Sequence, residues 1–341
     1  MRKHIFIMFI SLFIVLMSGC GQESMTSTTA KGKEKNVTIR IGIQQSLGPL
    51  LLAKEKGWFE KELEKEGVHV KWIEFQSGPP HFEAMASNNL DFGVVGNSPV
   101  IAAQAANIEF KEISKAAEGL KGDAIIVPQG SKINSLKDLK GKKIAVAKGS
   151  SGFNFLYEAL QHAGLKASEV EMIQLQPDEA QAAFDTHKVD AWAIWEPFIS
   201  YEVIKNKARI VADGEDLQAY SPSFIVARTG FIKEHPDLTV QFLKIYEKAR
   251  RWQNDHFNEA AEIYAKVKKL DKDVVLRALR NNPSLNEPIT DDIIQAQQKT
   301  ADFQYAQHII KTKINTSKVV DNQYIKQVFQ ELEKEGENKH E

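Results

Sequence analysis

The chain has 341 residues, enough for two domains of ordinary size, and 43% of them are hydrophobic and 26% charged. The 44 Lys and Arg residues nearly balance the 45 Asp and Glu residues, so the formal net charge is −1. This balance excludes a global basic field that would recruit nucleic acid or an anionic membrane surface. Any small anionic ligand must therefore be held by local geometry.

The N-terminus predicts a lipoprotein signal peptide, residues 1–19. Basic residues open the chain, and the apolar run 5–17 is shorter than the ~20 residues that a membrane-spanning helix needs. Two small residues, Ser18 and Gly19, precede Cys20, which is the only cysteine in the sequence. An unpaired core thiol is the alternative. A lone cysteine at this place favours cleavage before Cys20 and lipidation of its thiol.

Residues 20–36 predict a flexible tether that begins at the lipidated Cys20. The segment is rich in Ser, Thr, Lys, Gly and Glu and has too few apolar residues to bury a core. We therefore expect an extracytoplasmic protein that is held at the cell membrane by its lipid anchor.

Strands alternate with helices through the first folded unit. Alternating isoleucines predict the first strand, and glycines predict where the following helix breaks and stops. The predicted elements are strand Val37–Ile43, helix Leu50–Glu66 with a break at Gly57, strand Val68–Phe75, helix His81–Ser87, strand Asp91–Val95 and helix Val100–Ala106.

The pattern repeats in a second unit, and the remainder is mostly helical. This alternation predicts an α/β protein with mixed, mostly parallel sheets and a helical C-terminal part. The predicted strands are Ala124–Val127, Lys143–Ala147, Val170–Leu175, Val189–Trp195, Ala208–Ala212 and Ser223–Ala227. The predicted helices are Ser135–Leu139, Phe153–Ala163, Pro177–Thr186, Pro236–Asp255, Glu259–Lys268, Lys272–Asn281 and Asp291–Phe303, with a frayed end at 331–341.

Three polar turns share one pattern, in which a strand is followed by small or polar residues and then by a helix. They are Gln76–Pro79, Gly96–Pro99 and Lys148–Gly152. Helix starts expose unpaired N–H groups and a positive dipole end, which suit a small tetrahedral or planar anion. Ordinary helix capping is the alternative for each turn alone. Recurrence in both units favours anion binding.

Two tryptophans lie on opposite faces of the strand Val189–Trp195. Trp192 is expected in the core, and Trp195 is expected to form an apolar cleft wall. Glu196 has two possible roles: it either accepts a hydrogen bond from a donor in the cleft or caps the helix begun by Pro197, with capping slightly favoured.

Several segments together resemble the aliphatic sulfonate-binding proteins of ABC importers, over about residues 37–305. The Lys-Gly-Ser-Ser turn and the Asp-Ala-Trp-Ala-Ile-Trp strand are the most specific part of the resemblance. The segments that carry it are Ile39–Gln44, Glu74–Pro79, Leu90–Gly93, Gly96–Pro99, Val146–Ser151 and Val189–Pro197. The family is related to binders of taurine, nitrate and thiamine precursors.

The resemblance implies a two-lobe type II periplasmic-binding-protein fold. Lobe one would comprise residues 37–122 plus 222–341, and lobe two residues 123–221. The implied ligand is an alkanesulfonate captured between the lobes by a monomer that needs no cofactor and delivers it to a permease with a separate ATPase subunit. With Glu196 added because it directly follows the strand end, the expected ligand-binding residues are Gln45, Gly78, Asn97, Ser98, Ser150, Ser151, Trp195 and Glu196.

The competing class is an enzyme. The sequence has no Gly-x-Ser-x-Gly elbow, no His-Glu-x-x-His motif and no phosphate-binding loop with Lys. A relative of this fold makes a thiamine pyrimidine with pyridoxal phosphate, a cofactor that an exported lipoprotein would lack. We therefore expect a binding protein and not an enzyme.

Overall fold

The computed structural model describes residues 37–337. The predicted signal peptide, Cys20 and the tether lie outside these residues. Within the described part, none of the helices combines the length and the apolar character that crossing a membrane requires.

The first sheet has six strands in the order β11-β4-β10-β3-β1-β2. Its core strand β1 pairs in parallel with β2 along its whole length, and its isoleucines Ile39, Ile41 and Ile43 are buried, as their alternation predicts. The strands are β1 Val37–Gln44, β2 Val68–Phe75, β3 Phe92–Gly96, β4 Phe110–Ala117, β10 Ser223–Arg228 and β11 Ser284–Glu287.

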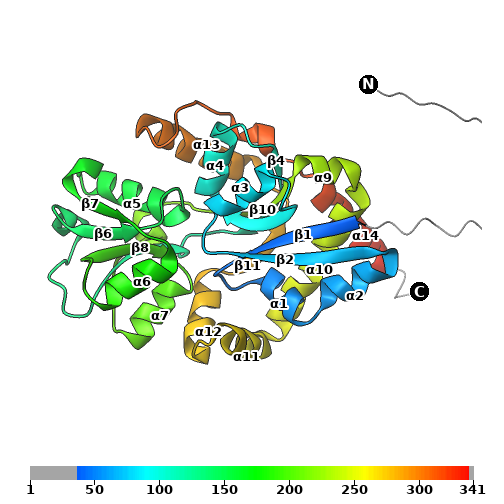
Figure 1. Cartoon of the computed structure of the whole chain (residues 1–341), viewed down its shortest axis with the longest axis horizontal. Helices are drawn as coiled ribbons and strands as arrows, with labels where there is room; N and C mark the ends of the chain where they lie inside the picture. Colours follow the sequence, from blue (N-terminus) through cyan, green and yellow to red (C-terminus); the bar gives the residue numbers. More distant parts are fainter. Residues whose placement is uncertain (1–36, 338–341) are drawn as a thin grey trace, which may run out of the picture. The chain divides into compact units, whose positions relative to one another are not determined.

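The second sheet has five strands in the order β7-β6-β8-β5-β9. Every residue of β5 is buried, which fits its interior place between β8 and β9. The strands are β5 Asp123–Val127, β6 Lys143–Val146, β7 Glu171–Gln174, β8 Ala191–Trp195 and β9 Arg209–Asp213. Figure 1 shows the two sheets, each with its own helices; we call them the first and the second lobe.

The sheets are mixed, but the prediction that they are mostly parallel is wrong. Four strand pairings are parallel and five are antiparallel in the described residues. Each antiparallel pairing involves β5, β10 or β11. All three strands start at the edge where β1, β3 and β8 end. β5 and β10 start there because the chain has just crossed from the other lobe, and β11 starts there because it follows Asn282, which lines the pocket between the lobes. A strand that starts there must run against the strands that end there.

Helices cover both sheets. Gly57 has a left-handed φ of 63° between α1 and α2, so the predicted break is confirmed. The helices are α1 Pro49–Glu55, α2 Trp58–Leu63, α3 Pro79–Ala86, α4 Asn97–Ala105, α5 Ser151–His162, α6 Pro177–Asp185, α7 Phe198–Lys205, α8 Gly214–Leu217, α9 Thr229–Glu234, α10 Pro236–Asp255, α11 Phe257–Lys268, α12 Lys272–Asn281, α13 Asp291–Ala306 and α14 Gln323–Glu337. The predicted helix at 135–139 is a short 3-10 turn, Leu136–Leu139.

The last helix corrects the expectation of a frayed end for residues 331–337, whereas 338–341 lie outside the described residues. α14 runs through Glu337 because Tyr324, Ile325 and Val328 pack into the core of the first lobe, where α10 lies. In that core Phe92 of β3 stacks on Phe242 of α10 with ring centroids 4.2 Å apart. One face of α14 is apolar and packs against the core. The many charged residues on its other face made the segment look unfolded in the sequence.

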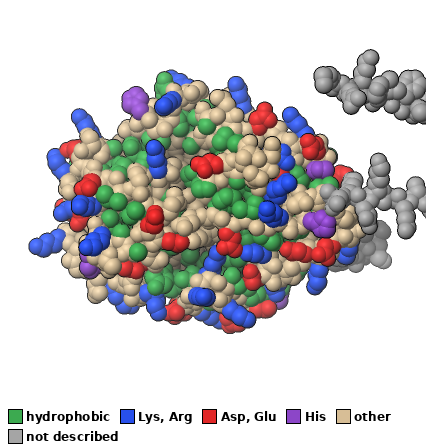
Figure 2. Space-filling model, in the orientation of Figure 1, with side chains coloured by type: hydrophobic (Ala, Val, Ile, Leu, Met, Phe, Trp, Pro, Cys, Tyr) green, Lys and Arg blue, Asp and Glu red, His purple; other side chains and the backbone are tan. Residues whose placement is uncertain are grey.

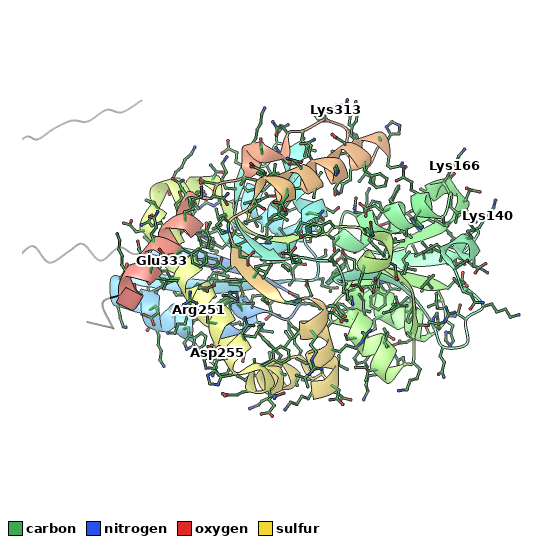
Figure 3. The ribbon with its side chains drawn as sticks, turned by 180° about the vertical axis from the view of Figure 1, so that it is seen from behind. Lys140, Lys166, Arg251, Asp255, Lys313 and Glu333 are labelled. Atoms are coloured by element: carbon green, nitrogen blue, oxygen red, sulfur yellow. The ribbon has the colours of Figure 1, made fainter. Side chains whose placement is uncertain are left out.

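Charged side chains lie on the outside of both lobes. Figure 2 shows Lys and Arg interspersed with Asp and Glu over the visible face, without a large patch of one sign. Figure 3 shows Lys140 and Lys166 projecting outward from the second lobe and Lys313 from the first. The interspersed signs agree with the near-zero net charge.

Candidate functional site

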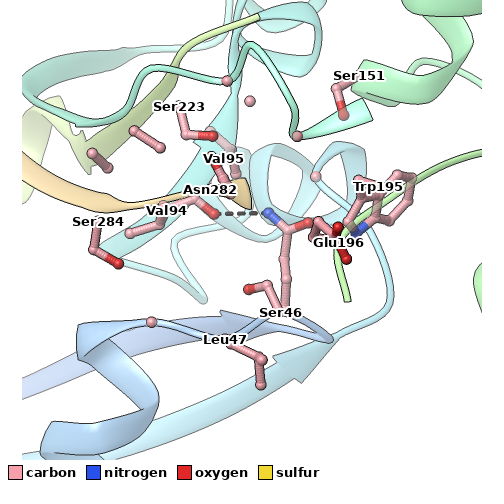
Figure 4. A pocket seen from close by; sticks show the side chains of 18 of the residues that line it. Ser46, Leu47, Val94, Val95, Ser151, Trp195, Glu196, Ser223, Asn282 and Ser284 are labelled. Carbon is pink, nitrogen blue, oxygen red and sulfur yellow. Dashed lines mark hydrogen bonds between the residues drawn. The ribbon is translucent and has the colours of Figure 1, made fainter. Parts of the chain in front are cut away.

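A pocket lies between the lobes, beyond the carboxyl ends of β1, β3, β4 and β8. Open α/β sheets bind ligands at this edge. The cavity volume is about 120 Å³, room for a small organic anion. Figure 4 shows Ser46, Ser223 and Ser284 of the first lobe facing Ser151 and Trp195 of the second. The lining residues come from both lobes.

The start of α5 presents backbone donors to this pocket. Ser150 caps the twelve-residue helix: its Oγ accepts from the N–H of Phe153 at 3.2 Å and donates to the carbonyl of Ala147 at 2.7 Å. The amides of Ser151 and Gly152 occupy the first helical positions, where no intrahelical acceptor exists. A Cβ built on Gly152 would lie 2.9 Å from the carbonyl oxygen of Ala193, so glycine lets the helix start approach β8.

The other two predicted turns offer fewer donors than expected. α3 begins with Pro79 and Pro80, which have no N–H, and the N–H of His81 donates to the carbonyl of Gly78. At the start of α4, the N–H of Asn97 donates to the carbonyl of Pro222 at 2.9 Å. The three predicted turns are therefore unequal, and the start of α5 offers the most donors among them. The start of α1, which was not predicted as a donor site, also lines the pocket.

The structure brings most of the predicted site residues to one place. Those that line the pocket are Gly78, Ser150, Ser151, Trp195 and Glu196.

Three predicted residues lie outside the pocket lining. Asn97 and Ser98 are buried behind it; Ser98 Oγ accepts from Gln304 Nε2 at 3.0 Å. Gln45 Nε2 donates instead to Asp178 of the second lobe at 3.3 Å. Its neighbours Gln44 and Ser46 line the pocket. Whether the predicted set binds a ligand stays a prediction.

The two tryptophans of β8 lie where the strand alternation places them. Trp192 is fully buried in the core of the second lobe, and Trp195 is partly exposed at the pocket. The ring of Trp195 meets Phe198 edge to face at 6.4 Å, which holds its orientation. Trp195 is the large apolar side chain that the second lobe presents to a ligand.

Glu196 makes the capping contacts considered from the sequence, and its other partners come from α12. Its carboxylate accepts from the N–H and Oγ of Ser200 in α7, at 3.0 and 2.9 Å. It also accepts from Asn281 Nδ2 of α12 at 2.7 Å and lies 3.8 Å from Arg277. Burial raises the pKa of Glu196, and these donors oppose the rise. Glu196 therefore links the second lobe to a helix of the first.

Asp123 is a pocket residue that the sequence analysis missed. Its carboxylate accepts from Ser151 Oγ at 2.7 Å and from Ser221 Oγ at 2.9 Å, and burial raises its pKa to about 6. Nothing in the local sequence marks this residue, because its position depends on where the chain crosses between the lobes. None of the pocket-lining residues in the described chain is Lys, Arg or His. The carboxylic acids in the lining are Asp123 and Glu196.

A family model described as NMT1/THI5 like matches residues 44–260, more than half of the chain. The chain belongs to the NMT1/THI5-like family. One relative of this chain is a Bacillus subtilis (strain 168) protein, provisionally named an aliphatic sulfonates-binding protein. That protein is 54% identical over 337 residues, which cover 99% of this chain and all of the relative.

Two solved structures are similar to this chain over most of its length. The alkanesulfonate-binding protein of Xanthomonas axonopodis pv. citri, bound to MOPS, is 31% identical with a TM-score of 0.79 and covers 84% of this chain and 98% of that one. The periplasmic aliphatic sulphonate-binding protein of Escherichia coli is also 31% identical, with a TM-score of 0.73, and covers 84% and 92%. The predicted two-lobe periplasmic-binding-protein fold is confirmed.

Proposed function

We propose that this chain is an extracytoplasmic solute-binding protein that captures aliphatic sulfonates between its lobes for an ABC importer. The observation that carries the proposal is the interlobe pocket, where the start of α5 meets neutral donors of the first lobe. The relative that matches the full chain at 54% identity bears the corresponding name. Residues 37–122 plus 222–341 would form lobe one, and 123–221 lobe two.

The donors of the pocket fit the chemistry of a sulfonate. A sulfonate keeps its charge at every physiological pH and has three acceptor oxygens. The backbone amide of Ser151, with serine hydroxyls from the first lobe, can pair these oxygens without titrating. Every unpaired oxygen would cost desolvation energy, so the ligand stabilises the arrangement in which both lobes contribute donors.

We further propose how the protein is held and which partners it meets. Residues 1–19 would be removed and Cys20 lipidated, which would anchor a monomer on the outer face of the cell membrane through the tether 20–36. The ligand-loaded protein would dock on a permease, and a separate subunit would hydrolyse ATP. The alternative of an enzyme that uses pyridoxal phosphate is not favoured. Pyridoxal-phosphate enzymes hold the cofactor through a lysine amine, and no lysine lines this pocket.

Calorimetry with a ligand panel tests the proposal. We expect methanesulfonate and pentanesulfonate to bind, and nitrate and a hydroxymethylpyrimidine to bind far more weakly or not at all. Taurine is included because relatives of this family bind it. The assignment to sulfonates would be overturned if nitrate or the pyrimidine bound and no sulfonate did.

A variant of Trp195 can distinguish binding of the ligand's alkyl tail from binding of its sulfonate group. Trp195→Ala removes the apolar wall, so pentanesulfonate should lose roughly tenfold in affinity, while methanesulfonate, which has little tail to bury, should lose much less. Trp252→Ala is the matched control, because Trp252 stacks on His256 at 4.6 Å and does not line the pocket. Equal losses for both ligands in Trp195→Ala would show that the tail lies elsewhere.

A further inference from the structure

The pocket between the lobes has a second polar end. Four of its lining residues form one row along the edge of the first sheet, where Ser284 pairs with Ala117, Ala117 with Ser223, and Ser223 with Gly96. The ends of this row are three strand spacings apart, which is about 14 Å. Gly96 lies at the α5 end, because a Cβ built on it would be 3.3 Å from Ser151 Cβ. Figure 4 shows Ser284 on the opposite side of the pocket from Ser151. A sulfonate held at the start of α5 is too small to reach Ser284, so another part of the ligand contacts this end.

Tyr246 of α10 brings an unpaired hydroxyl to the pocket. The residue lines the pocket although it is only 1% exposed and belongs to the core of the first lobe. None of the hydrogen bonds among the described residues involves its hydroxyl, yet the hydroxyl oxygen is not fully enclosed. The small exposed part of Tyr246 therefore includes the hydroxyl, which opens on the pocket. Burial raises the pKa of Tyr246, so this group stays a proton donor.

Ser284 of β11 supplies a second hydroxyl at the same end. β11 packs against α10, and Ser284 Oγ accepts from Gln253 Nε2 of that helix at 3.4 Å. Gln253 and Tyr246 lie seven residues apart, on one face of α10. Gln253 Oε1 in turn accepts from Tyr264 Oη at 2.6 Å, which fixes the end of the amide that faces Ser284. Because the oxygen of Ser284 already accepts, its proton is available to a ligand.

Asn282 supplies an acceptor that matches these two donors. It lines the pocket two residues before Ser284, and its Oδ1 is buried without a hydrogen-bond partner among the described residues. A methyl group of a ligand placed here would keep the hydroxyl of Tyr246 and the oxygen of Asn282 unpaired and away from water, which lowers affinity. A hydroxyl group both accepts and donates, so it can pair the two sides at once.

We propose that the pocket selects sulfonates that carry a hydroxyl group at the far end of a short alkyl chain, and that Tyr246 recognises this group. The inference rests on the proposed sulfonate-binding function, with the sulfonate at the start of α5, and narrows the class of substrate. The ligand hydroxyl accepts from Tyr246 or Ser284 and donates to Asn282. A site built to pair a ligand hydroxyl discriminates against the analogue without it, because the groups of the site are then left unpaired.

Matched pairs of ligands test the proposal by calorimetry. The members of a pair have the same number of non-hydrogen atoms and differ only in a terminal hydroxyl or methyl group. Terminally hydroxylated ethane-, propane- and butanesulfonate are compared with propane-, butane- and pentanesulfonate. In the pair whose length fits, wild-type protein should bind the hydroxylated member at least about tenfold more tightly. Hydrophobic burial alone would give the opposite order, since a methyl group gains more from leaving water.

Tyr246→Phe removes the hydroxyl and keeps the ring. The preference for the hydroxylated member should fall about fivefold or more, and affinity for the alkyl member should stay within about twofold. The urea midpoint should not fall, because the lost hydroxyl has no partner in the protein. Tyr324→Phe is the matched control: Tyr324 is buried outside the pocket lining, and its hydroxyl donates to the carbonyl of Ile232 at 3.1 Å. The control should lose stability and keep the preference.

Each outcome decides the question. If wild-type protein prefers the hydroxylated member in none of the pairs, the inference is overturned and sulfonate binding stands. Equal losses for both members in Tyr246→Phe also overturn it, because the tyrosine would then contact the sulfonate. If Tyr246→Phe does not fold, Ser284→Ala takes its place, and an unchanged preference in that variant has the same meaning. If no sulfonate binds wild-type protein, both proposals fail.

Discussion

Replacing Gly119 with alanine should lower the free energy of unfolding by roughly 3 kcal/mol or more. Gly119 lies where the chain leaves the first lobe, between β4 and β5, and its φ is +80°. A Cβ built there would lie 1.7 Å from the carbonyl oxygen of Ser221, where the chain returns. The two crossing segments therefore pass in direct backbone contact, which only glycine permits. The variant must separate them or distort both.

Urea denaturation of the variant, followed by circular dichroism, measures this effect. Gly130→Ala is the matched control, because Gly130 has a similar φ of +77° but nothing lies within 4 Å of the added Cβ. The control should lose only about 1 kcal/mol, from backbone strain alone. Equal losses in the two variants would show that the crossing segments can yield, and that their contact contributes little.

The second large effect is a gain in stability from Glu112→Gln, about 2 kcal/mol at neutral pH. Glu112 of β4 is fully buried, and its Oε1 accepts from Gln297 Nε2 at 2.6 Å. Its Oε2 and the Oε1 of Gln297 have no hydrogen-bond partner in the described structure. Burial raises the pKa of Glu112 to about 8. A glutamine supplies an N–H without requiring the protonation that the glutamate needs.

The sign of this effect follows from linkage. The folded-state pKa lies above the ordinary value of 4.5, so the contribution of Glu112 to stability is complete below pH 4.5 and is lost as the pH rises toward 8. Denaturation curves should therefore separate wild type from Glu112→Gln at about pH 7.5 and nearly coincide at about pH 4.5.

Glu247→Gln is a control of opposite sign for this prediction. Glu247 is also buried, but it pairs with Arg250 and Arg251 at 2.8 and 2.7 Å, and its pKa is lowered. This variant should lose stability at neutral pH, because its arginines lose their partner. A Glu112→Gln protein that is less stable than wild type at about pH 7.5 would mean that the buried carboxyl is ionised and stabilised by contacts that the structure does not show.

The elements with a simple hydrophobic period could be predicted from the sequence. The strand at 68–75 has the bounds predicted from its residues, and so do the helices at 236–255 and 272–281. β4 and β11 were missed because their buried positions carry polar residues: Glu112, Ser114 and Lys115 in β4, and Ser284 and Asn286 in β11. Each of them has a polar partner from another segment: Ser114 donates to Asn286 at 2.7 Å, Lys115 pairs with Glu287 at 3.0 Å, and Glu112 accepts from Gln297 at 2.6 Å. Because polar residues occupy these buried positions, the two strands do not show the alternation of apolar and polar residues that would predict them.

The candidate site was predictable where it depends on one strand or one helix start. The alternation in β8 separated Trp192 from Trp195, and the glycine-rich turn before α5 marked Ser150 and Ser151. The sequence could not predict which N–H groups at each turn are free to bind a ligand. The N–H of Asn97, for example, donates to the carbonyl of Pro222, which is far away in the sequence. Asp123 was missed for the same reason, since only the crossing of the chain brings it beside Ser151.

The place of β10 in the first sheet has a consequence for the order of folding. β10 lies between β3 and β4, yet it follows the whole second sheet in the sequence. As the chain emerges from a ribosome or an export channel, residues 123–213 are complete before the first sheet can close the gap between β3 and β4. The second lobe can thus assemble as a contiguous unit. The first stays open until its central strand arrives.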